Sequence, residues 1–225
     1  MNKISFDQKL LLFIKKSPVT ATLMILNLLM LLVTYIVGGF ENDVFVKLGG
    51  LAPILITDTH EYYRLLTSMF LHASLLHFLS NMLALYLLGI ALEKTMGPVR
   101  FTLLYFISGL GASVAIVLFA EPLRLTIGAS GAIYGIVGSL LYITFARPLW
   151  FTPQSVRSIR YMIVLNLFIT VIVPNVSIAG HIGGLIVGVL LSFILMPKKP
   201  YFTRFIREYN NGYETVNNGD DYTVS

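Results

Sequence analysis

The feature that most constrains this sequence is a series of long apolar stretches separated by short polar segments. A helix needs about 20 apolar residues to cross the hydrocarbon core of a bilayer. The stretches that reach or approach this length are Val19–Val37, Leu75–Leu92, Val99–Ala120, Thr126–Phe145, Ile159–Val173 and Val176–Met196. The fifth is short and ends at Pro174. We therefore expect an all-α, polytopic membrane protein, a bundle of six transmembrane helices.

Composition supports a membrane protein and excludes several chemistries. Only 12% of the 225 residues are charged, whereas a soluble domain has about 25%. The mean hydropathy is +0.79. There is no cysteine, which excludes disulfides, thiol chemistry and thiolate metal sites.

The positive charges indicate how the chain is oriented. If the N-terminus is inside, thirteen Lys and Arg residues fall on the inner segments and three, Lys47, Arg64 and Arg124, on the outer ones. This bias places both termini in the cytoplasm. The net charge of +5 is then a topology signal with some attraction to anionic membrane lipid. Because the cations are scattered over short loops, we expect no nucleic-acid binding.

Three parts of the chain follow from this topology. Residues 1–16 are expected to form a retained cytoplasmic tail, 17–197 the six-span domain, and 198–225 a polar, disordered cytoplasmic tail. The outer loop, about 39–73, is expected to be structured, with Val44–Ile56 interfacial or re-entrant. The short tails and the lack of a transit peptide favour a bacterial plasma membrane, in which the protein is multi-pass.

Polar residues occur at the outer ends of three expected spans. The second carries HASLLHFLSN with His77 and Asn81, the fourth carries Ser130, and the sixth carries His181. Ionisable and polar groups inside spans are costly and are functional candidates by default. All three spans run from outside to inside, so these groups can meet in one layer below the external surface.

Glycine spacing indicates which helices could meet. Gly131 and Gly135 form a GxxxG pair on the fourth span, and Gly184 and Gly188 form another on the sixth. Such pairs allow close helix contact. Contact here would bring the Ser130 hydroxyl within reach of the His181 imidazole, which is the minimal activated nucleophile for attack on a carbonyl.

Acyl transfer also needs donors for the developing oxyanion. The N–H of Ser130 lies in the first turn of its helix, where backbone donors are unpaired. His77 and Asn81 are spaced i, i+4 on one helix face and can donate from their side chains. His72 is five residues from His77, a different face of a continuous helix, so we expect it to brace the loop.

Other interpretations exist for each residue. A lone serine or a GxxxG pair in a membrane helix is usually a packing feature. A zinc site of His72, His77 and His181 is weakened by the lack of cysteine and of an HExxH pattern. A transporter or channel would carry polar residues through the midplane, whereas here they cluster near one face.

The sequence resembles the rhomboid family of intramembrane serine proteases over about Ser17–Met196. Its motifs here are HASLLHFLSN, ALEKTMGPVRF, the GASGAIYG that begins at Gly128, and GHIGGLIVG. The resemblance implies a dyad without a carboxylate, Ser130 as nucleophile and His181 as base, with no cofactor or metal. No Asp or Glu lies within the expected spans, in agreement with a dyad.

The resemblance assigns further roles. It implies an oxyanion hole from the Ser130 N–H, His77 and Asn81, and an aromatic, Tyr134, that stacks on the base histidine. Further matches are a cytoplasmic structural corner of Glu93, Gly97 and Arg100, and a membrane-embedded loop with Tyr63-Arg64 where Trp-Arg is commoner.

The activity expected from the resemblance is hydrolysis of peptide bonds in or near transmembrane segments of other membrane proteins. The active site would face outside, in a wet cavity capped by the loop at about Pro174–Ile178. Substrates would approach laterally, and the short fifth span would suit a movable gate. The alternative is an inactive rhomboid-like protein that binds membrane clients. Such relatives lack the serine or the histidine, and this chain has both.

Overall fold

The computed structural model describes residues 6–173 and 176–202. Within them the fold is all-α, as predicted, apart from one isolated bridge between Leu51 and Thr126. In the part of the chain that the structure describes, five helices are long and apolar enough to cross a membrane. They are α2 (Pro18–Val37), the continuous α6–η2–α7 (Leu75–Met96), α8 (Pro98–Phe119), α10 (Pro153–Ile172) and α11 (Ile178–Leu195). The remaining predicted span, the fourth along the chain, is α9 (Ser130–Ala146), which has 17 residues.

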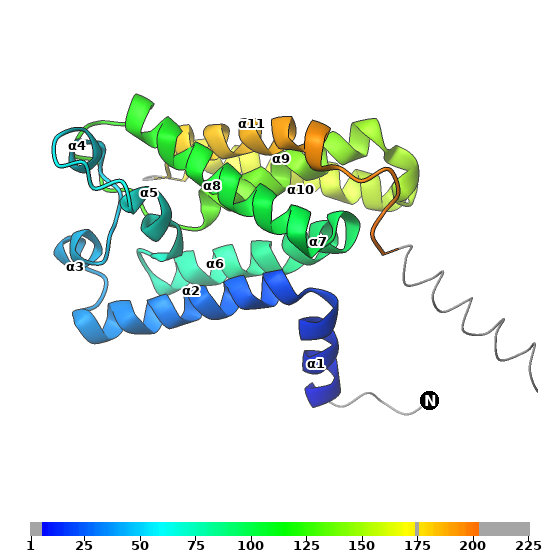
Figure 1. Ribbon diagram of the computed structural model, residues 1–225, viewed down its shortest axis with the longest axis horizontal. Helices are drawn as coiled ribbons and strands as arrows, with labels where there is room; N and C mark the ends of the chain where they lie inside the picture. The colour runs from blue at the N-terminus through cyan, green and yellow to red at the C-terminus, as the bar shows by residue number, and fades with distance from the viewer. Residues whose placement is uncertain (1–5, 174–175, 203–225) are drawn as a thin grey trace, which may run out of the picture.

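The remaining elements are short. They are α1 (Phe6–Lys16), α3 (Asn42–Lys47), α4 (Pro53–Thr57), α5 (Arg64–Thr67), the 3-10 turns η1 (Ser68–Phe70) and η3 (Pro148–Trp150), and the π-helical segment η2 (Leu85–Gly89). In Figure 1 the helices α3, α4 and α5 gather at one end of the molecule, which we call the loop end. The helices α1 and α7 lie toward the opposite end.

Local sequence explains where the long helices begin. Proline occupies the first position of α2, α8 and α10, where a missing N–H costs nothing. Side-chain oxygens cap the starts of α6, α10 and α11: Ser74 accepts from the His77 N–H, Thr152 from that of Ser155, and Ser177 from that of Gly180. Each cap satisfies one of the unpaired donors of the first turn.

Two predicted helix starts were wrong by four residues or more. Helix α10 begins at Pro153 rather than Ile159 and has 20 residues, so the fifth span is not short. Arg157 and Arg160 interrupt the apolar run, but such side chains can extend from a helix end toward the interface. Helix α9 begins at Ser130, four residues after the predicted start, because Thr126 is extended and pairs with Leu51 through bonds of 2.7 and 3.1 Å.

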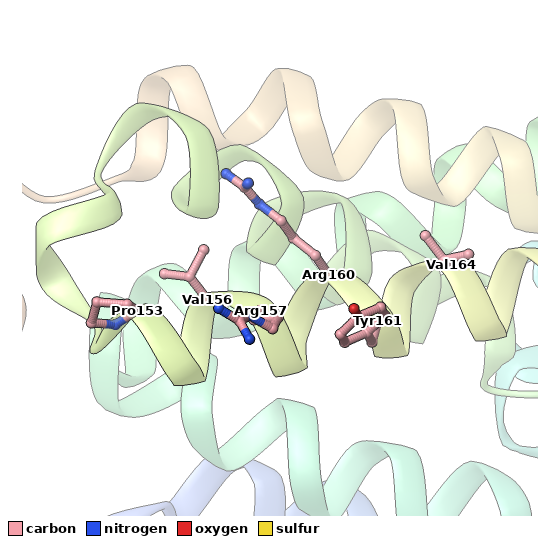
Figure 2. A pocket seen from close by; sticks show the side chains of 6 residues that line it. All are labelled: Pro153, Val156, Arg157, Arg160, Tyr161 and Val164. Carbon is pink, nitrogen blue, oxygen red and sulfur yellow. The ribbon is translucent and has the colours of Figure 1, made fainter.

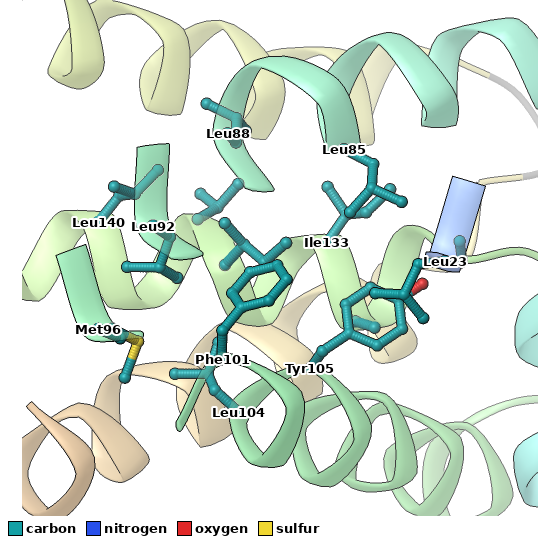
Figure 3. Close-up of a cluster of buried hydrophobic side chains, with 14 of the residues drawn as sticks. Leu23, Leu85, Leu88, Leu92, Met96, Phe101, Leu104, Tyr105, Ile133 and Leu140 are labelled. Carbon is teal, nitrogen blue, oxygen red and sulfur yellow. The ribbon is translucent and has the colours of Figure 1, made fainter. Parts of the chain in front are cut away.

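The core lies where α8, α9 and the second span pack against one another. Figure 3 shows Phe101, Leu104 and Tyr105 of α8 beside residues of the second span and of α9, all of them buried. The cluster comprises, among others, Leu23, Leu85, Leu88, Leu92, Met96, Ile133 and Leu140. This packing leaves the outer helix faces apolar and exposed, as expected of helices that face lipid.

A buried carboxylate holds the second span to the start of α2. Glu93 is 2% exposed and accepts from the N–H groups of Val19 and Thr20, both at 2.9 Å, and from the Thr20 hydroxyl at 2.7 Å. The span extends to Met96, so an acidic residue does lie within it, which corrects the prediction that none does. Glu93 is four turns from the polar residues at the start of α6, at the far end of the helix.

The turn that follows carries the other two residues of the predicted corner. Gly97 has φ +86°, a left-handed conformation that favours glycine, and it joins α7 to α8. Arg100 donates to the carbonyl of Met96 at 3.4 Å. The chain returns to this corner after α11, since the N–H of Tyr201 donates to the carbonyl of Thr95 at 2.9 Å.

The loop between α2 and α6 is structured, as predicted. Arg64 is 5% exposed and donates to the carbonyls of Val46 at 2.7 Å and Gly50 at 2.9 Å. Its guanidinium also pairs with Glu61, which accepts from the Tyr63 hydroxyl at 2.7 Å. The hydrogen bonds from Tyr63 and Arg64 hold the pKa of the Glu61 carboxyl below its usual value. The predicted C-terminal tail from residue 203 onward lies outside the described residues, as do residues 1–5 of the predicted N-terminal tail and positions 174–175 of the predicted cap.

Candidate active site

Ser130 is placed by the turn that starts α9. Gly128 has φ +133°, a conformation that L side chains rarely adopt, and its N–H donates to the carbonyl of Ser68 at 2.9 Å. This bond ties the turn to the loop end. Ser130 is the first residue of the helix, so its N–H belongs to the donors that have no partner inside the helix. The serine is partly exposed.

Helices α9 and α11 touch through their backbones. A Cβ at Gly184 would collide with the carbonyl oxygen of Gly131, and a Cβ at Gly188 would collide with that of Gly135. The predicted glycine pairs are therefore the contact surface of the two helices, in a geometry that larger residues would not permit. Gly131 and Gly184 thus set the separation between the chains that carry Ser130 and His181.

The contact between these helices brings the serine and the histidine together. Ser130 Oγ lies 2.9 Å from His181 Nε2, within hydrogen-bond distance. His181 is 8% exposed and lies in the first turn of α11. A hydroxyl and an imidazole in this arrangement can pass a proton from oxygen to nitrogen.

The His181 ring is held on two further sides. The ring of Tyr134, one turn below Ser130, stacks on it with a centroid separation of 4.0 Å and an interplanar angle of 17°. Its other nitrogen, Nδ1, lies 2.9 Å from Oγ1 of Thr170 on α10. Thr170 is 4% exposed and was not among the residues singled out from the sequence. A threonine in a membrane helix usually bonds its own backbone, so no pattern marks it.

His77 faces the same turn from α6. Its Nδ1 accepts from the N–H of Ala73 at 3.3 Å, so in the neutral ring the proton is on Nε2. A Cβ at Gly128 would lie 2.9 Å from His77 Nε2 and 3.6 Å from Ser130 Oγ. The missing side chain therefore leaves a space bordered by an N–H donor and by the serine.

Asn81 lies one turn further along α6 and is 6% exposed. Its amide nitrogen donates to the carbonyl of His77 at 3.0 Å. An amide has two N–H groups, so this bond leaves a second donor.

His72 is fully buried, and its ring packs edge-on against both His77 and Phe78, with centroid separations of 5.1 and 5.4 Å. The contact between His72 and His77 is possible because α6 begins at Leu75. His72 precedes the helix, so the argument that residues five apart lie on different helix faces does not apply to it. Burial, the main cause, and the charge of His77 lower the pKa of His72 to about 3, which keeps its ring neutral at pH 7.

Two pockets lie away from this site. The first, in Figure 2, runs along α10 and is lined by Pro153, Val156, Arg157, Arg160, Tyr161 and Val164. The second is lined by residues of α1, by Ser17 and by residues of η2 and α7. Within the described residues no three His, Cys, Asp or Glu side chains converge as a metal-binding group.

The fold and this site define a multi-pass helical membrane protein with a serine–histidine pair at one end of its bundle. The family model described as the Rhomboid domain matches residues 59–198, which are more than half of the chain. The chain belongs to the rhomboid family, and membership supports an intramembrane-protease-like function.

Several curated proteins are similar over most of this chain. RHOMBOID-like protein 1 of Arabidopsis thaliana is 35% identical over 171 residues, which are 74% of this chain and 43% of that protein. RHOMBOID-like protein 6, mitochondrial, of the same plant is 33% identical over 82% of this chain and 57% of its own length. Rhomboid protease GluP of Bacillus subtilis (strain 168) is 36% identical over 190 residues, 83% of this chain and 37% of that protein. The chain therefore spans roughly half or less of the length of each of these relatives.

Proposed function

We propose that this protein is an intramembrane serine endopeptidase that hydrolyses peptide bonds in or near transmembrane segments of other membrane proteins. The observation that carries the proposal is the 2.9 Å contact between Ser130 Oγ and His181 Nε2, beside a space with oxyanion donors. Similarity to a relative named a rhomboid protease supports the same reaction.

The proposed reaction begins with Ser130 as nucleophile. His181 Nε2 accepts the hydroxyl proton as Oγ attacks the carbonyl carbon of the substrate peptide. The oxygen that becomes negative lies in the space above Gly128, where the Ser130 N–H and His77 Nε2–H can donate to it. The second N–H of Asn81 is a further donor.

The remaining steps return the enzyme to its starting state. The protonated His181 gives its proton to the leaving amine as the C–N bond breaks, which leaves an ester on Ser130. Water then attacks the ester with His181 again as base, and the acid product and the free serine are released. No acidic partner is required, because the imidazole is already held by Tyr134 and Thr170.

The proposal includes a topology. The cations near Lys15, Lys94 and Arg157 lie away from the loop end, which favours that end as the external face of a bacterial plasma membrane. Both termini would be cytoplasmic, residues 17–197 would form the catalytic domain, and anionic lipid would contact the basic end. Substrates would approach laterally between helices, because a helical peptide bond is shielded and the strand must extend before attack.

Labelling by a fluorophosphonate tests the proposal directly. The wild-type protein in proteoliposomes should be labelled and should cleave a transmembrane substrate. The variants Ser130→Ala and His181→Ala should lose both signals while they keep their helical content. Asn81→Ala should have a milder effect than the loss of about 10²–10³ in kcat typical of an essential oxyanion donor.

The outcomes separate the functions considered. An inactive client-binding relative would show neither labelling nor cleavage in the wild type. Cleavage by Ser130→Ala at the wild-type rate would contradict the proposed dyad, because no other nucleophile is assigned to the site.

A further inference from the structure

We infer that Thr170 is a positioning residue for the proposed reaction, which fixes the proton of neutral His181 on Nδ1 and so leaves Nε2 free to accept from Ser130. This inference rests on the proposed function, but it concerns a property of the ring that can be measured in the absence of substrate. The side chain responsible lies on α10, a different helix from those of the serine and the histidine.

The hydroxyl of Thr170 has three polar neighbours. Its Oγ1 lies 3.0 Å from the carbonyl oxygen of Asn166, one turn earlier on α10, and 2.9 Å from His181 Nδ1. It also contacts the hydroxyl of Tyr134. The Tyr134 hydroxyl lies 2.6 Å from the same Asn166 carbonyl. Thr170 is buried, so no bulk water competes for these positions.

A count of protons decides the direction of each bond. The carbonyl of Asn166 can only accept, so both hydroxyls meet an acceptor there. Thr170 has one proton, and donating it to Asn166 leaves only lone pairs on Oγ1. Those lone pairs can accept from Tyr134 and from His181. Each hydroxyl has one proton, so at most two of the four contacts have a donor when His181 Nδ1 carries no proton. A proton on Nδ1 gives a third contact its donor, so the arrangement that satisfies the most contacts has His181 protonated on Nδ1.

The tautomer determines whether His181 can act as a base. A neutral imidazole has one N–H and one acceptor nitrogen, and a hydrogen bond at one nitrogen selects the state of the other. With the proton on Nδ1, Nε2 presents a lone pair to Ser130 Oγ at 2.9 Å. In the other tautomer Nε2–H would point at the serine and could not accept its proton.

The hydroxyl takes the position that a carboxylate occupies in a three-residue serine protease site. An orienting carboxylate holds the tautomer and also stabilises the imidazolium, whereas a neutral hydroxyl supplies the first effect without a full charge. We therefore expect its removal to cost less than the loss of a carboxylate, about 10- to 100-fold in kcat.

The experiment compares Thr170→Val, which keeps the shape and removes the hydroxyl, with Thr170→Ser, which keeps the hydroxyl. The matched control is Thr34→Val on α2, because Thr34 is also buried and also bonds a carbonyl one turn earlier, that of Met30 at 2.8 Å. Thr34 lies outside the site.

The first readout is nitrogen NMR of the protein with ¹⁵N-labelled histidine in detergent micelles. Spectra are taken at about pH 8.5, above the ordinary histidine pKa of about 6.5. The His181 signals are assigned by their loss in His181→Ala. Wild type, Thr170→Ser and Thr34→Val should show a protonated Nδ1, and Thr170→Val should show a shift toward the Nε2–H form. A protonated Nε2 in the wild type, or no change in Thr170→Val, overturns the inference even if the protein has no activity.

The second readout is cleavage kinetics. Thr170→Val should lower kcat about 10- to 100-fold with KM within about twofold, as expected when an interaction is needed for chemistry and not for substrate binding. Thr170→Ser should recover most of the rate, and Thr34→Val should match the wild type. An active wild type with Thr170→Val at the same kcat contradicts the role of Thr170 and leaves the dyad intact, whereas an inactive wild type contradicts the proposed function.

Discussion

Helices α11 and α10 both reach the site, but they are held to the bundle in different ways. On α11 the glycines at 184 and 188 allow its backbone to touch that of α9, and a side chain at either position would collide with a carbonyl. The two helices are buried inside the bundle to a similar extent, so they differ in the kind of contact that they make: 22% of the most apolar stretch is buried on α11 and 17% on α10. Most of the large apolar residues of α10 are exposed, as expected of a helix at the edge of a bundle.

The difference shows two ways to position a catalytic group. The proposed nucleophile, Ser130, and the proposed base, His181, lie on helices whose separation is fixed by backbone contact, so no side chain packed between the helices sets the distance between their backbones. The proposed orienting residue, Thr170, lies on a helix that buries only two other residues, Ile159 and Ile163, and that also makes polar contacts with its neighbours. At the loop end these involve Thr170 and Tyr134, and at the other end Arg160, which donates to the carbonyl of Thr144 at 2.8 Å.

The largest effect on stability and activity is expected when a side chain is added at the backbone contact between α9 and α11. Gly184→Val would place atoms on the carbonyl of Gly131, so α9 and α11 must separate and the Ser130–His181 contact must break. We expect a loss of about 3 kcal/mol or more in stability, at or above the usual range for overpacking, together with the loss of cleavage. Thermal unfolding in detergent and the cleavage assay would measure both.

The matched change on α10 is Val164→Leu, which adds a methylene to a side chain that is 63% exposed. Its effect should stay within about 0.5 kcal/mol. If Val164→Leu were as damaging as Gly184→Val, the contrast between the two helices would be wrong.

The next effect is expected at the turn before the serine. Gly128→Ala would push a methyl group into the space beside His77, where the oxyanion is proposed to lie. We expect kcat to fall about 10²-fold or more. Gly39→Ala is the control, because Gly39 also has a positive φ, +87°, but nothing within 4 Å of a Cβ. Gly39→Ala should cost about 1–2 kcal/mol of backbone strain and leave kcat unchanged; equal kcat losses would mean that strain, not the filled space, is responsible.

Hydropathy predicted the spans because lipid requires a long apolar helix whatever its neighbours are. The residues at which the helices begin and end were less predictable. Glu93 and Lys94 stopped the predicted second span early, although Glu93 is accommodated by the start of α2. The π-helical segment Leu85–Gly89 has no sequence signature, since it reflects how the turn packs within the bundle.

The site was predictable to the extent that it depends on spacing along one helix. The glycines on α9 and α11 indicated that Ser130 and His181 could meet, and one-turn spacing put Tyr134 below the serine. Thr170 could not be found in this way, because its contact with His181 depends on the rotation of α10 about its own axis. That rotation is set by tertiary packing. The half of α10 around Thr170 is apolar on nearly every side, so no periodic pattern marks the side that packs inward.

The smallest effect is expected at the far end of α10. Arg160 donates to the carbonyl of Thr144, and its guanidinium lies 4.2 Å from the ring centroid of Phe145. Arg160→Ala should therefore lower stability by about 1 kcal/mol. Because α9 and α11 stay in backbone contact, kcat should remain within about threefold of the wild type, a change near 0.7 kcal/mol.

Arg157 provides the control for Arg160, since it lies nearly one turn earlier on α10 and lines the same pocket (Figure 2). Arg157 is exposed, and no hydrogen bond or ion pair of its side chain occurs within residues 6–173 and 176–202. Arg157→Ala should change stability by less than about 0.5 kcal/mol. Equal losses from the two variants would mean that charge near the membrane surface, not the contact with α9, holds this end of α10. A large loss of kcat in Arg160→Ala alone would mean that the two ends of α10 are coupled, and that the orientation of His181 depends on the whole helix.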